Sequence, residues 1–440
     1  MGQQNRSSDP ARQWTEAQAE SQLRSLELFG MRFGLDRMRR MMTVLGSPER
    51  RFDTVHVLGT NGKSSTTRMT AAILKRHALR TGAYLSPHLV SYRERVQIDG
   101  EQLDGDAFGA AVARATWAAE RVNRTLAEDD HVTQFELLTA AALWQMAEHE
   151  VDVAVVEAGL GGRYDATSVI DSPVAVLTNV GLEHTRWLGP TITDIAEEKL
   201  AVARRDGTLV LGADLHPDAL RVAERIASER GTRIIHAPAA RLAARLLARG
   251  EFQRRNFALA TAAAEAHLRS AGIELREHAV LEAAATTEVP GRLQLLEGDP
   301  PTVLDGAHNP DAAQALAAAI PELLGDRPLA LVLGVLEDKD AAAMLSALLP
   351  VCRCAWFTAP PSSRALSPAA LVSLARQMGF EDVHCEVRPS LALEQARAWA
   401  GGSGGAVLAT GSVYLVGDLL AARLGEPSES RLRVRQGMPR

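Results

Sequence analysis

The sequence is poor in cysteine and in aromatic side chains. Its three cysteines, Cys352, Cys354 and Cys385, are an odd number, and the Cys-x-Cys pair lacks the spacing of a metal site. We therefore expect free thiols in a reducing compartment. Aromatic residues make up 4% of the chain, which argues against a platform on which nucleic-acid bases stack.

The sequence also lacks a strong excess of charge of one sign and any long apolar run. The formal net charge is -6 over 440 residues, so nothing indicates a general affinity for nucleic acid. Residues 1–20 are polar, without the apolar stretch of a signal peptide, and no apolar run reaches membrane-spanning length. We expect a cytoplasmic monomer with neither nucleic-acid nor membrane partners.

Buried-type strands alternate with helical patterns along the chain, which predicts an α/β protein with mainly parallel sheets covered on both faces. Strands are expected at 54–58, 83–85, 151–156, 174–177, 209–211 and 233–236, and in a second series at 302–304, 329–333, 355–358, 383–387 and 406–409. Helices are expected at 63–79, 133–150 and 192–204, in an interrupted stretch at 21–45, and in the Ala-rich segments 239–248 and 312–319. Residues 1–20 and the tail after Gly425 read as loose ends.

A domain boundary is expected near residue 292. The dipeptide Pro290-Gly291 and the acidic, Pro-rich segment 297–301 interrupt the alternation there. The length also favours two domains. The sequence therefore predicts a first domain at 1–292 and a second at 293–440.

The segment Gly59-Thr60-Asn61-Gly62-Lys63-Ser64-Ser65 lies between an expected strand and an expected helix. Glycines let backbone N–H groups turn toward oxyanions, and the helix start adds its positive dipole end. Lys63 can reach between terminal phosphates, and Ser64 or Ser65 can approach a phosphate or its metal. Val57 stands where a full Walker A motif has glycine. A tight glycine turn capped by serine is the alternative, which the flanking strand and helix disfavour.

Polar side chains follow two neighbouring strands of the same expected sheet. Glu157 ends the strand at 151–156, and Glu183 and His184 follow the strand at 174–177. A carboxylate at such a position in a phosphate-loop enzyme is commonly a magnesium ligand, and parallel strands bring their carboxyl ends to one edge. Taken singly, Glu157 could be a helix cap and His184 an ordinary loop residue. Together they favour a metal site.

With these residues in view, the chain resembles the folylpolyglutamate synthase/dihydrofolate synthase family of the Mur ligase superfamily, from about Leu26 to Leu420. The motifs are Gly34-Leu35-Asp36-Arg37-Met38, the phosphate loop, Ser86-Pro87-His88-Leu89, Arg93-Glu94-Arg95, Thr133-Gln134-Phe135-Glu136, 157–167, 178–184, Pro290-Gly291-Arg292, 305–310 and Thr410-Gly411-Ser412. Their order and spacing are specific. The resemblance implies a P-loop-type domain followed by a smaller Rossmann-like α/β domain, the Mur ligase architecture.

The resemblance also implies roles for residues at matching positions. Magnesium ligands would be Ser86, Glu157 and His184; Lys199 would be carbamylated, and Lys63, Lys199 and His308 would be catalytic. ATP would be bound by Thr60, Asn61, Gly62, Lys63, Ser64, Ser65, Asn256, Arg292 and Asp305, and the folate substrate by Asp36, Arg37, Phe135, Gly162, Arg163 and Asp165. Arg292 could instead be a solvated linker residue and Phe135 a core residue. Ser64 replaces a glycine that is common in the family, so which of Ser64 and Ser65 faces the phosphates stays open.

The implied activity is ATP-dependent ligation of L-glutamate to dihydropteroate, to folylpolyglutamate, or to both, through an acyl phosphate. Mg²⁺ would assist, and the partners would be ATP, L-glutamate and dihydropteroate or reduced folates. A peptidoglycan-type Mur ligase is one alternative, but only 58 residues precede Gly59, too few for the nucleotide-sugar domain of those enzymes. A non-catalytic ATP-binding regulator is another, and the complete expected metal site argues against it.

Overall fold

The computed structural model describes residues 14–26, 34–238 and 245–424, and the chain divides into two compact units. Unit 1 comprises residues 1–86, 92–241 and 256–283, and unit 2 comprises residues 87–91, 242–255 and 284–440. Each unit contains one sheet. The boundary after residue 292 stays a prediction.

Unit 1 is built on an eight-stranded sheet in the order β4-β3-β2-β5-β1-β6-β7-β8. The strands are β1 Asp53–Leu58, β2 Thr81–Tyr84, β3 Val96–Ile98, β4 Glu101–Gln102, β5 Val153–Glu157, β6 Val174–Leu177, β7 Thr208–Leu211 and β8 Arg233–His236. All pairs are parallel except β2–β3 and β3–β4. The prediction of a mainly parallel sheet is confirmed.

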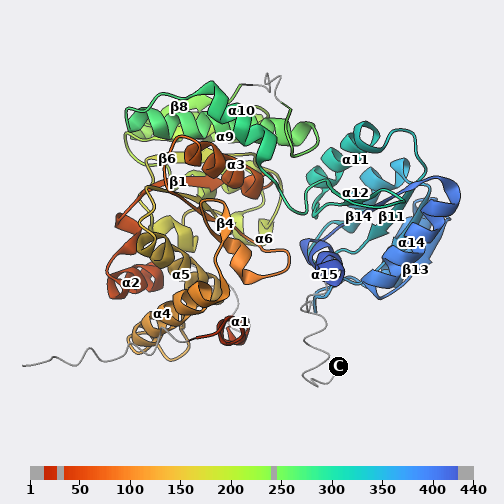
Figure 1. Ribbon diagram of the computed structural model, residues 1–440, viewed down its shortest axis with the longest axis horizontal. Helices are drawn as coiled ribbons and strands as arrows, with labels where there is room; N and C mark the ends of the chain where they lie inside the picture. The colour runs from red at the N-terminus through yellow and green to blue at the C-terminus, as the bar shows by residue number, and fades with distance from the viewer. Residues whose placement is uncertain (1–13, 27–33, 239–244, 425–440) are drawn as a thin grey trace, which may run out of the picture. The chain divides into compact units, whose positions relative to one another are not determined.

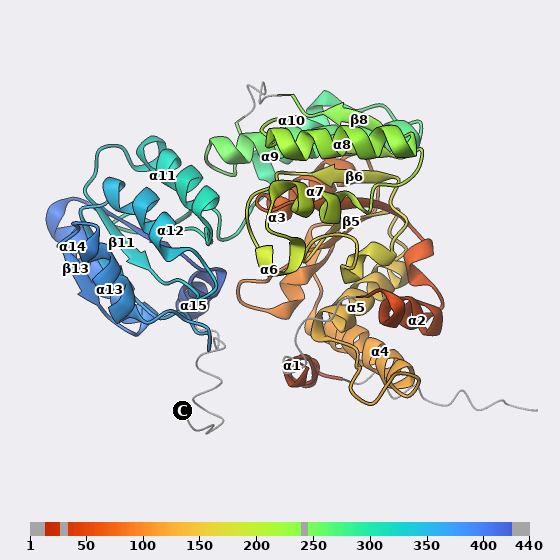
Figure 2. The ribbon, with the colours of Figure 1, turned by 180° about the vertical axis from the view of Figure 1, so that it is seen from behind.

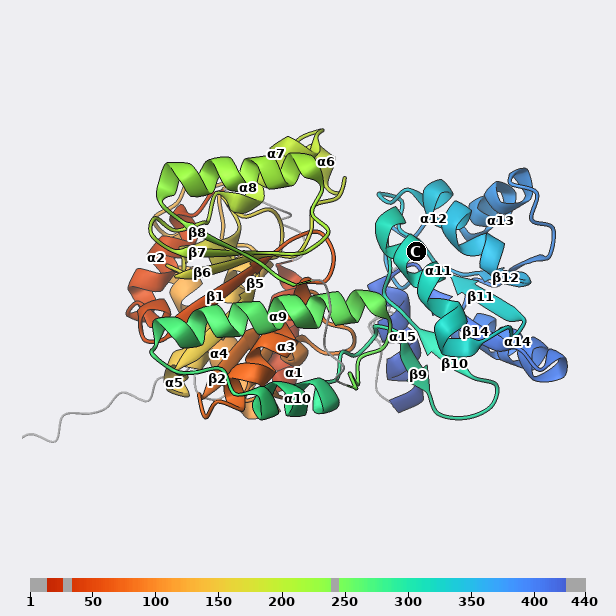
Figure 3. The same cartoon turned by 90° about the horizontal axis from the view of Figure 1, so that it is seen from above.

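Helices cover both faces of this sheet, which is why its central strands are apolar without alternation. In Figure 3, helix α8 (Pro217–Arg230) lies on one side of the strands, and α3 (Lys63–Lys75) and α9 (Glu251–Ser270) lie on the other. Helix α7 (Ile192–Leu200) runs beside α8 and packs on β6 and β7 through one apolar cluster (Figure 2). The remaining element of this part of the chain is the short helix α6, Thr185–Leu188.

A second group of helices packs in one apolar cluster with β2 and β5 and lies below β1 in Figure 1. These are α1 Glu16–Ser25, α2 Asp36–Leu45, α4 Gly105–Asn123 and α5 Gln134–Glu148, with the 3-10 turns η3 Pro48–Arg50, η4 Tyr92–Arg95 and η5 Ala166–Val169 nearby. Helix α5 starts with a capping box between Thr133 and Glu136. Helix α10 spans Glu277–Thr286.

Unit 2 contains a six-stranded sheet in the order β13-β12-β11-β14-β10-β9, of which only the β9–β10 pair is antiparallel. Its strands are β9 Gln294–Leu296, β10 Thr302–Leu304, β11 Leu329–Leu333, β12 Cys354–Phe357, β13 Val383–Cys385 and β14 Ala406–Thr410. Helices α11 (Pro310–Leu324) and α12 (Ala341–Leu348) lie on one face and α14 (Pro389–Ser403) and α15 (Val413–Leu424) on the other (Figure 1). Helix α13 (Pro368–Gln377) and the turn η6 (Leu349–Val351) complete the unit. The predicted α/β class, with a second, smaller α/β unit, is confirmed.

Several local expectations are wrong. Residues 1–20 are not loose throughout, because α1 begins at Glu16 behind a capping box formed by Thr15 and Gln18. The short strands β3, β4 and β9 were not expected, since each contains a glutamine and none is a continuous apolar run. Of the Ala-rich segment 239–248, residues 239–244 lie outside the described part and residues 245–248 are not helical, whereas α11 contains the segment 312–319. The tail after Gly425 also lies outside the described residues.

No helix in the described ranges is long and apolar enough to cross a lipid bilayer.

Candidate active site

The phosphate loop joins β1 to α3, and residues that follow β6 fix its backbone through hydrogen bonds. Asn61 donates its N–H to Asn179 Oδ1 at 2.8 Å, and Thr178 donates its hydroxyl to the Asn61 carbonyl at 2.6 Å. Gly62 caps α3 with φ 81°, where an added Cβ would lie 2.5 Å from Asn256 Oδ1. A side chain at Gly62 would therefore strain the backbone and displace Asn256. Asn179 was missed as a site residue, although it lies inside the motif 178–184.

Lys63 folds back over the loop that precedes it. Its Nζ donates to the carbonyls of Gly59 at 3.1 Å and Thr60 at 3.0 Å. The ammonium thus lies at the N-terminus of α3, beside the loop N–H groups, where both favour an anion. Phosphate binding by Lys63 stays a prediction.

Glu157 lies at the edge where β2, β5, β1 and β6 end. The register pairs Glu157 with Val57 of β1, and its side chain is buried at 1% exposure. Its Oε1 accepts the Ser64 hydroxyl at 2.9 Å and its Oε2 accepts the Ser86 N–H at 3.1 Å. Ser65 is instead buried at 2% exposure. Ser64, not Ser65, is therefore the loop serine that reaches the carboxylate.

A hard divalent cation suits these donors. The described residues contain no group of three or more His, Cys, Asp or Glu side chains that could enclose a metal. Mg²⁺ needs no such enclosure, because it is usually held by one or two carboxylates together with substrate phosphates and waters. A buried carboxylate with a serine hydroxyl beside a phosphate loop fits that pattern. Glu157 and Ser64 are thus suitable ligands by chemical type.

Glu183 and His184 follow β6 on the same sheet edge. His184 precedes α6 with φ 54°, and its Nε2 lies 3.9 Å from Glu183 Oε1. The imidazole is exposed and the carboxylate mostly covered, with side-chain exposures of 38% and 11%. The His184 side chain is thus exposed to solvent, whereas the Glu157 side chain at the same edge of the sheet is buried.

Lys199 lies in the last turn of α7 and is buried at 5% exposure. Its Nζ donates to the Gly59 carbonyl at 2.8 Å, so the amine contacts the first residue of the phosphate loop. Burial lowers the pKa of Lys199 to about 7, and the nearby charge of Lys63 acts in the same direction while Glu183 and Asp165 oppose it. A large fraction of this amine is therefore neutral near neutral pH, which an ordinary lysine is not.

The expected substrate residues occupy two places in unit 1. Arg37 is buried and paired, with Nε 3.0 Å from Glu136 Oε1 and Nη1 3.0 Å from Asp130 Oδ1, so it joins α2 to α5. Asp36 is exposed beside Arg40 at 2.8 Å. The Phe135 ring packs on Gly159, where an added Cβ would lie 2.5 Å from it. Substrate binding by these side chains stays a prediction.

The other expected substrate residues lie in the loop after β5. Arg163 is exposed, and its Nε donates to Glu198 Oε1 at 2.8 Å. Gly162 packs on the last turn of α7. Asp165 is buried, and burial raises its pKa while hydrogen bonds from Thr167 and from backbone N–H groups act against the rise. The structure gives Asp165 a part in holding its own loop, and contact of these residues with substrate stays a prediction.

Unit 2 carries the remaining expected residues around the end of β10. Asp305 is buried and accepts the N–H groups of Leu293 at 2.9 Å and Ala307 at 2.8 Å. Burial raises the pKa of Asp305, and the nearby Arg292 charge acts against the rise. Arg292 donates to the Gly291 carbonyl at 2.9 Å, and His308 Nδ1 lies 2.8 Å from the Gly306 carbonyl. Because a carbonyl only accepts, Nδ1 carries the proton, and the neutral ring has its lone pair on Nε2.

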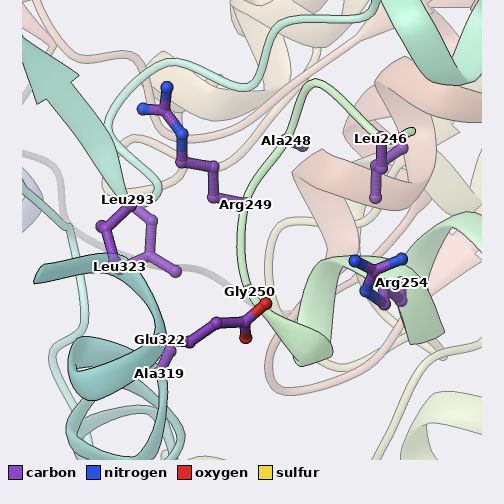
Figure 4. A pocket seen from close by; sticks show the side chains of 9 residues that line it. All are labelled: Leu246, Ala248, Arg249, Gly250, Arg254, Leu293, Ala319, Glu322 and Leu323. Atoms are coloured by element: carbon purple, nitrogen blue, oxygen red, sulfur yellow. The ribbon is translucent and has the colours of Figure 1, made fainter. Parts of the chain in front are cut away.

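A cavity of about 140 Å³ lies elsewhere in unit 2, between the residues before α9 and helix α11 (Figure 4). It is lined by Leu246, Ala248, Arg249, Gly250, Arg254, Leu293, Ala319, Glu322 and Leu323. Only Leu293 connects it to the expected site, through the hydrogen bond to Asp305.

Comparison with known proteins covers almost the whole chain. The Mur ligase middle domain matches residues 57–216, and the Mur ligase glutamate ligase domain matches residues 291–413. The chain is 33% identical to a folylpolyglutamate synthase of Lacticaseibacillus casei over 89% of this chain and 95% of that protein. It is 35% identical to a probable bifunctional folylpolyglutamate synthase/dihydropteroate synthase of Haloferax volcanii, of which it spans about half the length, 49%.

Solved structures agree in fold. A Mycobacterium tuberculosis folylpolyglutamate synthase complexed with ADP and AMPPCP superposes with a TM-score of 0.86 at 31% identity, covering 94% of this chain and 100% of that one. Escherichia coli FolC in complex with DHPP and ADP superposes with a TM-score of 0.82 at 28% identity, covering 95% and 99% of the two chains.

Proposed function

The chain belongs to the folylpolyglutamate synthase/dihydrofolate synthase family of ATP-dependent glutamate ligases, and we propose that it joins L-glutamate to dihydropteroate, to reduced folates, or to both. One observation carries the proposal: Lys63, Ser64, Glu157 and Lys199 converge on one phosphate loop. A module that only binds a nucleotide does not need a buried, weakly basic lysine there. The match to a folylpolyglutamate synthase over 89% of the chain supports a folate ligase rather than a peptidoglycan-type ligase. A cytoplasmic monomer is part of the same proposal.

The reaction has two steps. A substrate carboxylate oxygen bonds to the γ-phosphorus of ATP, and the bond from that phosphorus to the β–γ bridging oxygen breaks. ADP departs, and the substrate is now an acyl phosphate. The α-amino nitrogen of glutamate then attacks the acyl carbon, the bond to the phosphate oxygen breaks, and an amide, phosphate and a proton result. Lys63 and the N–H groups of the loop hold and neutralise the transferred phosphate, so their share is positioning and charge stabilisation.

Ser86, Glu157 and His184 are the proposed magnesium ligands, and the Ser64 hydroxyl lies beside Glu157. The ion, when bound, neutralises charge on the terminal phosphates. The protein orients Glu157 before any ion binds. The Ser64 hydroxyl and the Ser86 N–H each donate to one of the two carboxylate oxygens of Glu157.

Lys199 is the proposed carbamylated lysine. Its neutral amine nitrogen bonds to the carbon of CO₂ and releases a proton, which converts the neutral amine into a carbamate anion. Burial supports this step, since it lowers the pKa of Lys199 to about 7. The carbamate then acts as a fixed negative charge beside the phosphate loop, where the free amine now contacts Gly59.

Unit 2 contributes Arg292, Asp305 and His308 to the proposal. Arg292 offers a two-pronged guanidinium for nucleotide oxygens. Asp305 fixes the turn that follows β10 through two N–H groups. His308 is the candidate base for the amine proton of glutamate, because the neutral ring with Nδ1–H keeps a lone pair on Nε2.

The test is glutamate incorporation by Lys63→Ala. With ATP, labelled L-glutamate and either dihydropteroate or tetrahydrofolate, we expect roughly a 100-fold or greater loss of product. Lys75→Ala is the matched control, because Lys75 lies at the other end of α3, exposed, and donates only to the Asp99 carbonyl at 2.6 Å. Undiminished ligation by Lys63→Ala, or ADP release that needs neither glutamate nor folate, would overturn the proposal.

A further inference from the structure

Two polar residues are buried in unit 1 with no part in the proposed reaction, His56 on β1 and Thr167 in η5. They are 1% and 0% exposed, and His56 Nε2 lies 2.8 Å from Thr167 Oγ1. The Thr167 hydroxyl also bonds Asp165 Oδ1. Because the Thr167 hydroxyl donates its single proton to Asp165, it can only accept from His56, which donates its Nε2–H to Thr167. Burial lowers the pKa of His56 to about 4, which agrees with a neutral ring in this role.

Asp165 ties together the two ends of the loop in which it lies. Its Oδ2 accepts the Leu160 N–H at 2.7 Å, and its Oδ1 accepts the Thr167 N–H at 3.0 Å as well as the Thr167 hydroxyl. The loop from Leu160 to Thr167 is therefore closed on one buried carboxylate, and Thr167 anchors that carboxylate to β1 through His56.

The closed loop rests on the last turn of α7. Arg163 donates its N–H to the Glu198 carbonyl at 2.9 Å. At Gly162 an added Cβ would lie 2.5 Å from the Lys199 carbonyl oxygen and 2.6 Å from that of Glu198. Backbone packs directly on backbone here, so a displacement of the loop moves the turn that carries Lys199.

Lys199 completes a circuit that starts on β1 and ends at the residue directly after it. Its Nζ bonds the carbonyl of Gly59, three residues after His56. We propose that Thr167 and His56 are positioning residues for Lys199: through Asp165 and the loop they fix its amine against the phosphate loop. This inference rests on the proposed function, in which Lys199 acts as a carbamate.

The decisive substitution is Thr167→Val, which keeps the side-chain shape and removes the hydroxyl. Asp165 then loses one donor, and the N–H of His56 loses its acceptor. Because the loop is less firmly held, the amine of Lys199 is less well placed to be carbamylated. We expect kcat to fall roughly tenfold and the bicarbonate concentration for half-maximal activity to rise by a similar factor. Thr167→Ser keeps the hydroxyl and should restore both.

Thr232→Val is the matched control. Thr232 is a buried threonine of unit 1 whose hydroxyl bonds the Arg204 carbonyl at 2.8 Å. It contacts none of the circuit, so the variant loses a similar hydrogen bond and should keep the wild-type kcat and bicarbonate response. If Thr167→Val does not fold, Gly162→Ala is the second variant. It disturbs the packing of the same loop against the last turn of α7, and it should show the same fall in kcat and the same rise in the bicarbonate requirement.

The outcomes separate the two proposals. Wild-type protein that forms no glutamyl product refutes the proposed function itself. Active wild-type protein in which Thr167→Val matches Thr232→Val in kcat and in bicarbonate response refutes the positioning role. A Thr167→Val variant that loses activity without any change in its bicarbonate response also refutes it, because the loss would then be unconnected with Lys199.

Discussion

The state of Lys199 gives the sharpest prediction, because carbamylation requires a neutral amine. With its pKa at about 7, about half of the Lys199 amines are neutral at pH 7. For an ordinary lysine of pKa about 10.4 the neutral fraction at pH 7 is about four in ten thousand. Burial thus raises the reactive fraction roughly a thousandfold. We expect ligation activity to depend on CO₂ at neutral pH for this reason.

The assay compares protein freed of CO₂ with the same protein after addition of bicarbonate. Activity should fall on CO₂ removal and return with bicarbonate, and ¹³C-labelled CO₂ should give a carbamate signal that Lys199→Ala abolishes. Lys75→Ala should keep both. Full activity of Lys199→Ala, or a wild-type rate unaffected by CO₂ removal, would refute this reasoning.

The same pKa makes a prediction about stability without CO₂. Between about pH 7 and pH 10 the unfolded lysine holds a proton that the folded lysine has lost, so the free energy of unfolding rises with pH. The contribution is about 1.4 kcal/mol per pH unit. Lys199→Met removes it. Urea unfolding of this variant and of wild-type protein should therefore show Lys199→Met more stable at pH 7, with a difference that shrinks as pH rises. A difference that does not change with pH would contradict a pKa near 7.

Three further substitutions test other contacts. Ser64→Ala removes a hydrogen bond to a buried carboxylate, which is worth of the order of 1.5 kcal/mol or more, so kcat/KM should fall about tenfold. The variant should also need a higher Mg²⁺ concentration for half-maximal activity. An unchanged Mg²⁺ requirement would contradict this. Glu136→Ala removes a buried carboxylate 3.0 Å from Arg37 and leaves the more exposed Asp130 at the same distance, so it should cost about 3 kcal/mol in denaturant unfolding, whereas a loss below about 1 kcal/mol would indicate a weak pair. Gly62→Ala should destabilise the fold by about 1 kcal/mol or more and weaken ATP binding, measured by calorimetry, because φ is 81° and Asn256 lies in the way; wild-type ATP affinity would contradict the placement.

The sequence by itself determined the parts that depend on neighbouring residues. The strand ending at Leu58, the glycines of the loop and the helix beginning at Lys63 follow from a short local pattern, and the structure has all three. The sequence also predicted that Glu157 lies where parallel strands end, because strands with apolar residues on both faces indicate a parallel sheet. The short strands β3, β4 and β9 were not predicted, since each contains a glutamine and none is a continuous apolar run.

Tertiary structure alone decided the electrostatics and the partners. Lys199 reads in the sequence as an ordinary helix-surface lysine, and only burial against Gly59 lowers its pKa to about 7. Ser64 and Ser65 are indistinguishable in sequence, but α3 turns one toward Glu157 and the other inward. Arg37 meets Glu136 across 99 positions, and His56 meets Thr167 across 111. Such contacts depend on the packing of distant segments, and the cost of removing charge from water depends on what surrounds it, so neither is written in local sequence.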